Sequence, residues 1–263
     1  MNLYERDYTK ILNDEEQEAW DKEQKFISRK GIKTNRDSKK FSHPNENVRK
    51  FIWCKSSLYP NNILLLSKYK NTQLQLEADA FREIIYKAKN ELEIQRYIKE
   101  NRKWFIPGSV FLDYNFGNHG LYLFPEQKLG NDYAVDYMLL GANSDGYSIV
   151  FIEFEMANTE YLIQAENTES KSVRKGISQI RDWERWINKN RDYFLRNIGL
   201  TGHGIDVPIY RIYYYLVVSR RDYMNEDALD VRSQTIYHHT NLKIVTFDRL
   251  ADNIAKLGKH HGW

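Results

Sequence analysis

The stretch that decides the fold is Ala134-Val135-Asp136-Tyr137-Met138-Leu139-Leu140 together with Ser148-Ile149-Val150-Phe151-Ile152-Glu153-Phe154-Glu155. Both halves are rich in aromatic and branched aliphatic residues, which favour β-strands. The residues between them, 141–146, have the Gly, Asn and Asp chemistry that reverses a chain. The pattern predicts two neighbouring strands joined by a turn.

Three carboxylates lie in this hairpin. Asp136 interrupts the apolar run 133–140, and Glu153 interrupts the run 149–154, with Glu155 directly after it. A carboxylate in a buried strand is costly unless its desolvation is offset, and a hard divalent cation is a usual partner. The alternative is that all three side chains point to the solvated face of an amphipathic hairpin. The strand pattern alone leaves both interpretations open.

The composition indicates an ordinary globular protein. The chain has 263 residues, 41% hydrophobic and 29% charged, which is enough for one sizeable core or two small domains. A net charge of +3 is too small to indicate a nucleic-acid partner by itself. The single cysteine, Cys54, cannot form an internal disulfide, and no apolar run is long enough to span a bilayer. We therefore expect a cytoplasmic protein without a membrane partner.

Helices and strands are expected to alternate after residue 73. Apolar residues recur at helical spacing to residue 101, with a break near Asn90. Strands are expected at 110–114, 120–124, 209–218 and 243–247, and helices at 170–194, 227–238 and from 248 onward, with a polar loop at 156–169. This order predicts an α/β fold with a central mixed sheet flanked by helices. Phe51-Ile52-Trp53 and residues 63–66 read as two short strands, which predicts a small N-terminal α+β region.

The hairpin carboxylates suit one kind of chemistry. Phosphodiester hydrolysis needs a polarised phosphate, an activated water and a stabilised leaving oxygen, and Mg²⁺ held by one or two carboxylates provides these. Asp136 and Glu153 on adjacent antiparallel strands can meet at one end of the sheet. Glu91 or Glu93 on the first long helix and Gln179 on the second are candidates for a further ligand or an orienting group.

Six segments in order resemble one family. They are the helix Glu91-Leu92-Glu93-Ile94-Gln95-Arg96-Tyr97-Ile98, the strand residues 126–137, Phe151-Ile152-Glu153-Phe154-Glu155, the helix 172–186, and the closing strands 215–221 and 244–250. Together they resemble the nuclease domain of the Shedu anti-phage defence proteins, of the PD-(D/E)XK phosphodiesterase superfamily. The resemblance spans roughly residues 88–256. It implies a restriction-endonuclease-like core in a nuclease domain, 86–263, after a variable region, 1–85, that acts as a sensor or regulator.

The resemblance also implies roles for individual residues. Asp136 matches the first metal ligand and Glu153 the second, with the carbonyl of Phe154 also facing the metal, Mg²⁺ or Mn²⁺. Glu91, on the first helix, would support the metal site, and Gln179, on the second helix, would be an orienting group at the same site. The implied substrate is DNA, and the implied assembly is a homo-oligomer.

The chain departs from the superfamily motif at Glu155, where a lysine is expected. A glutamate cannot stabilise an anionic transition state, although it can be a third metal ligand. Lys171, Arg174 or Lys175 could supply the positive charge instead. Lys175 is the first choice, because it lies one turn before Gln179 on the same side of the helix.

Two hypotheses of different classes follow. The first is a divalent-metal-dependent endonuclease that hydrolyses DNA in prokaryotic anti-phage defence, with Asp136, Glu153 and Glu155 at the metal. The second is a catalytically inactive nuclease-fold module that binds nucleic acid or a partner protein. An RNA-directed nuclease is a third possibility. The sequence leaves open the form of the substrate, the trigger and the oligomeric state.

Overall fold

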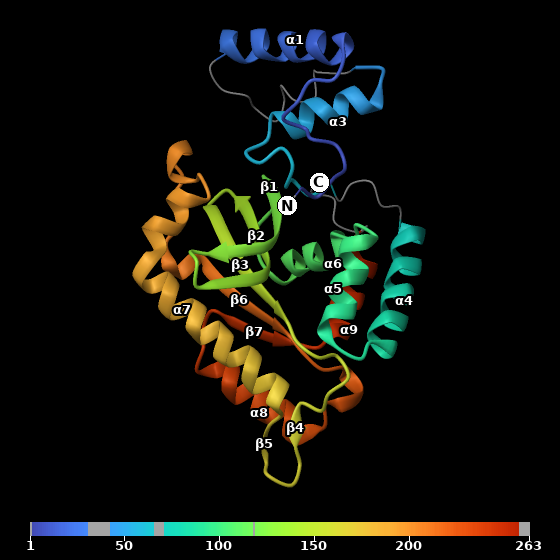
Figure 1. Ribbon diagram of the computed structural model, residues 1–263, viewed down its shortest axis with the longest axis vertical. Coiled ribbons are helices and arrows are strands. Elements are labelled where there is room, and N and C mark those ends of the chain that lie inside the picture. The colour runs from blue at the N-terminus through green and yellow to red at the C-terminus, as the bar shows by residue number, and fades with distance from the viewer. Residues whose placement is uncertain (1, 31–42, 66–70, 118, 258–263) are drawn as a thin grey trace. The chain divides into compact units, whose positions relative to one another are not determined.

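The computed structural model describes residues 2–30, 43–65, 71–117 and 119–257 (Figure 1). The chain divides into two compact units, Asn2–Ile63 and Leu64–Trp263. No helix in the described ranges is both long and apolar enough to cross a lipid bilayer.

The regular elements of the N-terminal unit are helices in its described residues, apart from a single β-bridge at Ile63, and turns and irregular segments connect them. It contains α1 (Asp14–Lys30) and α3 (Glu46–Lys55), which pack against each other. The strand expected at Phe51-Ile52-Trp53 is wrong, because these residues belong to α3. Val48, Phe51 and Ile52 bury one face of the helix at helical spacing, and an apolar run this short does not distinguish strand from helix. The second expected strand, residues 63–66, is also wrong in its described part, because Ile63 forms only a single β-bridge and residues 64 and 65 have no regular structure. Leu66 lies outside the described residues.

The second unit is built on a five-stranded sheet in the order β1-β2-β3-β6-β7. The strands are β1 (Gly120–Leu129), β2 (Tyr133–Asn143), β3 (Gly146–Phe154), β6 (Ile212–Val217) and β7 (Leu242–Val245). The first three pair antiparallel, whereas β3–β6 and β6–β7 pair parallel. The predicted hairpin and the predicted α/β fold with a mixed sheet are confirmed.

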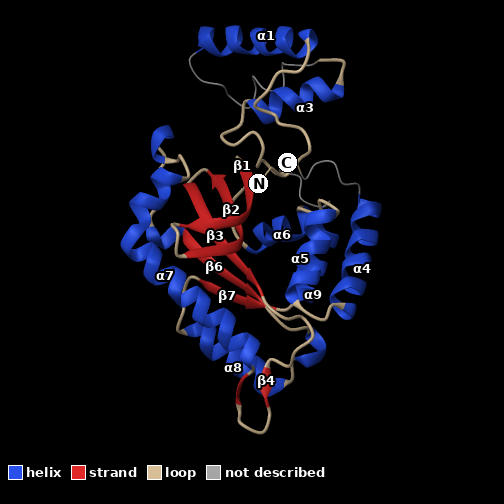
Figure 2. Ribbon diagram, in the orientation of Figure 1, coloured by secondary structure: helices blue, strands red, loops and turns tan. Residues whose placement is uncertain are grey.

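Helices cover both faces of this sheet (Figures 1 and 2). The helices are α4 (Asn71–Lys87), α5 (Glu91–Glu100), α6 (Phe105–Gly108), α7 (Lys171–Asn197), α8 (Glu226–Tyr237) and α9 (Phe247–Lys256). Alternate side chains of β3 identify the two faces. Phe151 contacts Phe194 of α7, with ring centroids 5.6 Å apart, whereas Phe154 contacts Phe247 of α9 at 5.2 Å.

Two local predictions were wrong, and one was confirmed. Residues 110–114 do not form a strand, because the chain continues from α6 into a 3₁₀ helix, Ser109–Asp113. The expected loop 156–169 contains a small hairpin of β4 (Leu162–Ile163) and β5 (Thr168–Glu169). The expected helix break near Asn90 is confirmed: its side chain accepts from the N–H of Glu93 and so begins α5.

Helix α4 packs against α9 and belongs to the second compact unit. Compactness therefore separates the chain between Ile63 and Leu64. The functional division into a regulatory region, 1–85, and a nuclease domain, 86–263, stays a prediction.

Candidate metal centre

The sheet directs the three hairpin carboxylates toward α7. Side chains of an extended chain alternate between the two faces of a sheet. Glu153 lies two residues after Phe151 in β3, and Glu155 lies two residues further, directly after the strand, so both lie on the α7-facing side with Phe151. On β2, Tyr137 contacts Phe154 on the opposite face at 5.3 Å, so its neighbour Asp136 points toward α7. The last β2–β3 pair is Tyr137 with Ile152, which brings Asp136 next to Glu153.

Asp136 is held at the end of the β2–β3 ladder. Its Oδ2 accepts a hydrogen bond from the backbone N–H of Phe154 at 2.7 Å, and Gln95 of α5 also hydrogen-bonds to it. Burial raises the pKa of Asp136, and the negative charges of Glu91 and Glu155 raise it further. The hydrogen bonds from Phe154 and Gln95 lower this pKa in part, and a bound cation would lower it further.

Of the three carboxylates, Glu153 has the negative charge that its surroundings compensate least. Only 5% of the residue is solvent accessible, and its Oε2 is buried without a hydrogen-bond partner in the described part of the chain. Burial is the main cause that raises the pKa of Glu153, and the negative charges of Asp136 and Glu155 raise it further. A buried acceptor without a donor is costly, and a cation would satisfy it.

Glu155 has two partners on α7. Its Oε2 accepts from the hydroxyl of Ser172 at 3.0 Å, and its Oε1 lies 3.0 Å from the ammonium nitrogen of Lys175. The side chain is only 1% exposed. Burial still raises the pKa of Glu155, although Lys175 opposes the shift. The buried Glu155 is thus compensated by a lysine that reaches it from the next helix.

Lys175 also joins the first helix to the site. Its ammonium lies 3.4 Å from Oε1 of Glu91, at the start of α5. Glu93 is used differently, because its carboxylate accepts from the N–H of Lys89 at 2.9 Å and so stabilises the helix N-terminus. Of the two glutamates considered on this helix, Glu91 therefore lies at the site.

Two further residues of α7 complete the site. Gly176 lets the helix approach the sheet closely, since a Cβ there would lie 2.5 Å from Cδ1 of Leu216 and 3.1 Å from Cγ of Glu155. Gln179 follows Lys175 by one turn, and its Oε1 is buried without a hydrogen-bond partner among the described residues. Lys171 and Arg174, the other cations considered, are exposed and form no ion pair with an acid that the structure describes.

The donor set fits a hard divalent cation in its chemistry. It offers carboxylate oxygens from β2 and β3, the unpartnered Oε2 of Glu153 and the unpartnered Oε1 of Gln179. In the described residues, no three His, Cys, Asp or Glu side chains already form a metal-binding group. Asp136 instead faces the Phe154 N–H, and Glu155 faces Ser172 and Lys175. A cation would therefore compete with these protein donors for the carboxylates.

The sequence reasoning missed two residues that contact the site. Gln95 follows Glu91 by one helical turn, so the i, i+4 spacing on α5 could have identified it. Ser172 joins the start of α7 to the segment after β3, because its hydroxyl donates to Oε2 of Glu155 and accepts from the N–H of Met156 at 3.2 Å. A serine in the first turn of a helix has many uses, and nothing in the sequence distinguishes this one.

Comparisons with known proteins place the chain in a family. The family model described as "Shedu protein SduA, C-terminal" matches residues 88–251. A comparison with curated protein sequences found no match.

Two solved structures of restriction endonuclease FokI are similar at a low level. The DNA-bound form has a TM-score of 0.37 and 12% identity, over 84% of this chain and 33% of that chain. The second FokI structure has a TM-score of 0.33 and 10% identity, over 71% of this chain and 31% of that chain. This chain thus spans about a third of the FokI length. At these TM-scores the likeness carries no argument about the site.

The family match covers more than half of the chain, and it includes all the segments that form the carboxylate site: α5, β2, β3 and the first half of α7. The chain therefore belongs to the Shedu family, whose C-terminal domain it contains at residues 88–251.

Proposed function

We propose that this protein is a divalent-metal-dependent endonuclease that hydrolyses DNA phosphodiester bonds in prokaryotic anti-phage defence. The observation that carries the proposal is the convergence of Asp136, Glu153 and Glu155 on one face of the sheet, beside Lys175. Their raised pKa values and the unpartnered Oε2 of Glu153 indicate a site that lacks positive charge.

In this proposal Asp136 and Glu153 hold Mg²⁺ or Mn²⁺, with Glu155 and the carbonyl of Phe154 as further ligands. The cation, when bound, neutralises charge on the phosphate and the leaving oxygen. Gln95 orients Asp136, and Gln179 directs its amide into the site from α7.

Lys175 takes the part that the motif lysine has in the superfamily. Its ammonium, 3.0 Å from Glu155, carries positive charge on the same edge of the sheet although it comes from a helix. In contact with a scissile phosphate, it would stabilise the charge that develops on the non-bridging oxygens. Glu91 holds it in position by the second ion pair.

The remaining parts of the proposal rest on the family. The protein acts on DNA in the cytoplasm as a homo-oligomer, and residues 1–85 act as a sensor or regulator.

A plasmid-nicking assay tests the proposal. Wild-type protein is incubated with supercoiled plasmid in Mg²⁺ or Mn²⁺, beside Asp136→Asn and the matched control Asp145→Asn. Asp145 lies in the turn at the other end of the same hairpin and is exposed. The expected result is metal-dependent nicking by the wild type and the control, and none by Asp136→Asn. No cleavage of single- or double-stranded DNA by the wild type, in either metal, overturns the nuclease proposal.

A second candidate function is a module that binds nucleic acid or a partner without cutting. Two observations favour it: Glu155 replaces the motif lysine, and the carboxylates already have protein donors. Tight DNA binding by gel shift without cleavage in either metal supports this candidate.

A further inference from the structure

The outer surface of α7 is mainly positive beside the carboxylate site, and the two acids of the same stretch, Asp182 and Glu184, are only half-exposed. Between residues 171 and 189, the exposed positions of this helix are Lys171, Arg174, Lys175, Ser178, Arg181, Arg185, Asn188 and Lys189. Six of these are cations and none is an acid. The chain as a whole has a net charge of only +3, so this helix face concentrates positive charge that the overall balance does not reveal.

Most of these cations are not neutralised by neighbours. Lys171, Arg181 and Lys189 form no ion pair with any residue that the structure describes, and Arg174 hydrogen-bonds only to the hydroxyl of Thr168 at 3.3 Å. Arg185 pairs with Asp182 on its own helix, and Lys175 serves the carboxylate site. The unpaired charges are therefore available to a polyanion.

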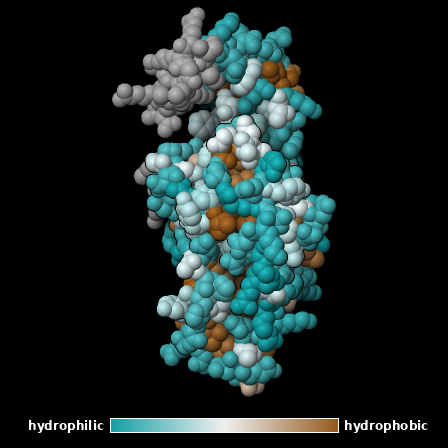
Figure 3. Space-filling view, turned by 90° about the vertical axis from the view of Figure 1, so that its left-hand side faces the viewer, coloured by the Kyte–Doolittle hydropathy of each residue, from teal (hydrophilic) through white to brown (hydrophobic). Residues whose placement is uncertain are grey.

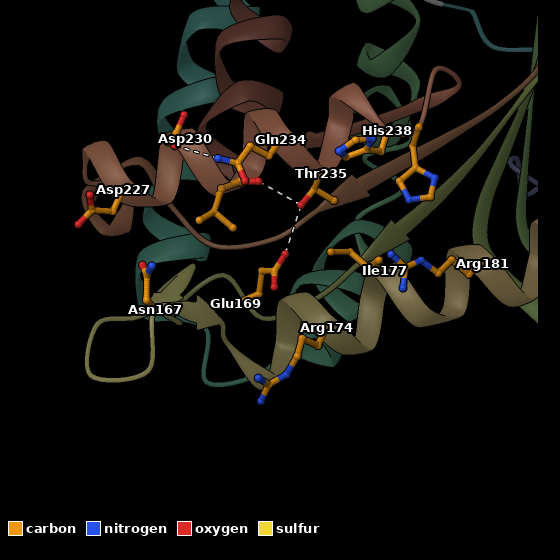
Figure 4. Close-up of a pocket in the computed structure, with 12 residues that line it drawn as sticks. Asn167, Glu169, Arg174, Ile177, Arg181, Asp227, Asp230, Gln234, Thr235 and His238 are labelled. Atoms are coloured by element: carbon orange, nitrogen blue, oxygen red, sulfur yellow. Dashed lines mark hydrogen bonds between the residues drawn. The ribbon is translucent and has the colours of Figure 1, made fainter.

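A groove of about 700 Å³ runs beside this helix face and restricts where a polyanion can lie (Figure 4). Arg174 and Arg181 line its α7 side, whereas Asp227 and Asp230 line its α8 side. Arg174 extends from α7 away from the α8 side chains (Figure 4). The acids on the α8 side of the groove repel phosphate, so a phosphate backbone would follow the outer side of α7. The molecular side that carries α7 is largely hydrophilic (Figure 3).

The cations of α7 form a row that starts at the carboxylate site and extends away from it. Its first turns contact the site through Ser172 and Lys175, and its cations continue to Lys189. At 1.5 Å per residue, Lys171 and Lys189 lie about 27 Å apart along the axis, which is close to eight base-pair steps of B-form DNA.

We propose that the exposed face of α7, from Lys171 to Lys189, binds the phosphate backbone of duplex DNA and leads it to the carboxylates at the end of β3. The inference rests on the proposed nuclease function and assigns the surface that binds its substrate. Arg181, Arg185 and Lys189 lie beyond the reaction site, so they contribute to DNA binding without taking part in cleavage.

The test measures binding of a fluorescein-labelled 30-base-pair duplex by anisotropy, with Ca²⁺ in place of Mg²⁺, over a series of salt concentrations. The test variant is the triple substitution Arg181→Ala, Arg185→Ala and Lys189→Ala. The matched control removes three exposed cations elsewhere, by Lys10→Ala, Lys22→Ala and Lys87→Ala; each of these lysines has an acidic partner nearby. Circular dichroism verifies that all the proteins are folded, which is expected because the substituted side chains are exposed and alanine favours helices at the helical positions.

The expected result is at least roughly tenfold weaker binding by the test variant, with a salt slope smaller by about 2 to 3, because each lost phosphate contact removes about 0.9 from the slope. The control should retain at least half of the wild-type affinity. Plasmid nicking by the test variant should recover at high protein concentration, because the carboxylate site is intact.

The outcomes separate this inference from the proposed function. If the wild type cuts DNA and the test variant binds with unchanged affinity and salt slope, the assignment of the α7 surface as the DNA-binding surface is wrong and the nuclease function stands. If the wild type neither binds nor cuts DNA, both fail. Tighter binding to single-stranded RNA than to duplex DNA also overturns the inference.

Discussion

The ammonium nitrogen of Lys175 lies 3.0 Å from Oε1 of Glu155, so a positive charge from α7 lies beside the strand-end position at which the superfamily motif has a lysine. The two residues come from consecutive elements, with Glu155 directly after β3 and Lys175 in the first turns of α7. Gly176 makes this meeting possible, since the helix backbone lies against Glu155 and Leu216.

Lys175→Met should lower the rate of DNA cleavage by at least roughly a hundredfold, because loss of a positioned charge at the phosphate is worth several kcal/mol in the transition state. Lys175→Arg should retain part of the activity. The rates are measured in single-turnover assays at saturating enzyme, so that differences in DNA binding do not contribute. Lys87→Met, an exposed lysine at the end of α4, is the matched control, and its rate should stay within about threefold of wild type. Equal rates for wild type and Lys175→Met would remove Lys175 from the reaction.

Exchanging the charges of the pair tests their coupling. Glu155→Lys alone breaks the ion pair and brings two cations together at a position whose side chain is 1% exposed. This should cost about 1–3 kcal/mol of folding stability, because the carboxylates of Asp136 and Glu153 offset part of the roughly 3–5 kcal/mol expected for a broken buried pair. The double variant Glu155→Lys, Lys175→Glu restores opposite charges and should recover most of this loss. Chemical denaturation of the wild type, both single variants and the double variant gives the coupling energy. Additive losses would show that the two side chains do not act as a pair.

Gly176→Ala should destabilise the protein by about 1–3 kcal/mol, because the new methyl would overlap Leu216. The clash outweighs the gain of roughly 1 kcal/mol that alanine brings to a helix. Cleavage should also fall, since Glu155 has to move. Gly202→Ala is the matched control, because a Cβ there would meet nothing within 4 Å, and its stability should change by less than about 0.5 kcal/mol. Thermal and urea unfolding measure both variants, and a neutral Gly176→Ala would contradict the close approach of α7.

The carboxylates predict opposite effects of pH with and without metal. Burial raises the pKa values of Asp136, Glu153 and Glu155 in the folded protein, so the folded state binds more protons than the unfolded state. The metal-free protein should therefore lose stability as pH rises from the ordinary carboxylate range toward the raised values. Metal binding requires deprotonated ligands, so stabilisation by Mn²⁺ should increase over the same range. Melting temperatures at about pH 6 and about pH 8.5, with Mn²⁺ and with chelator, measure both trends. A Mn²⁺ stabilisation that is larger at the lower pH would exclude these groups as ligands.

The sequence predicted the sheet better than its surroundings. The aromatic and branched aliphatic residues of β2 and β3 and the Gly/Asn/Asp turn were enough for the hairpin. The apolar run expected as a strand at 209–218 contains β6 (Ile212–Val217), although Ile209–Arg211 form a 3₁₀ helix before it. Phe51-Ile52-Trp53 was assigned to a strand because a three-residue apolar run has no readable period. The strand expected at 110–114 failed because α6 and Ser109–Asp113 bury their apolar residues in tight turns.

The site shows the same division. The position of Lys175 relative to Gln179 followed from helical geometry. The meeting of Asp136 and Glu153 at one end of the sheet followed from their expected places on adjacent antiparallel strands. Gln95 and Ser172 could not be found in this way, because their roles depend on how α5 and α7 approach the strand ends. Tertiary contacts such as those at Gly176 determine how the helices approach the strands, and these contacts produce no periodicity or motif that can be recognised in the sequence.

The central claim is that Asp136 and Glu153 hold a divalent cation, and titration of Mn²⁺ into the metal-free protein tests it most directly. Isothermal titration calorimetry should detect at least one Mn²⁺ per chain in the wild type and in the control Glu160→Gln, an exposed glutamate after the same strand. Glu153→Gln keeps the size of the side chain but removes its charge, and it should weaken Mn²⁺ binding by at least roughly tenfold. Equal Mn²⁺ affinity in the wild type and Glu153→Gln, or no binding by the wild type, would contradict the account.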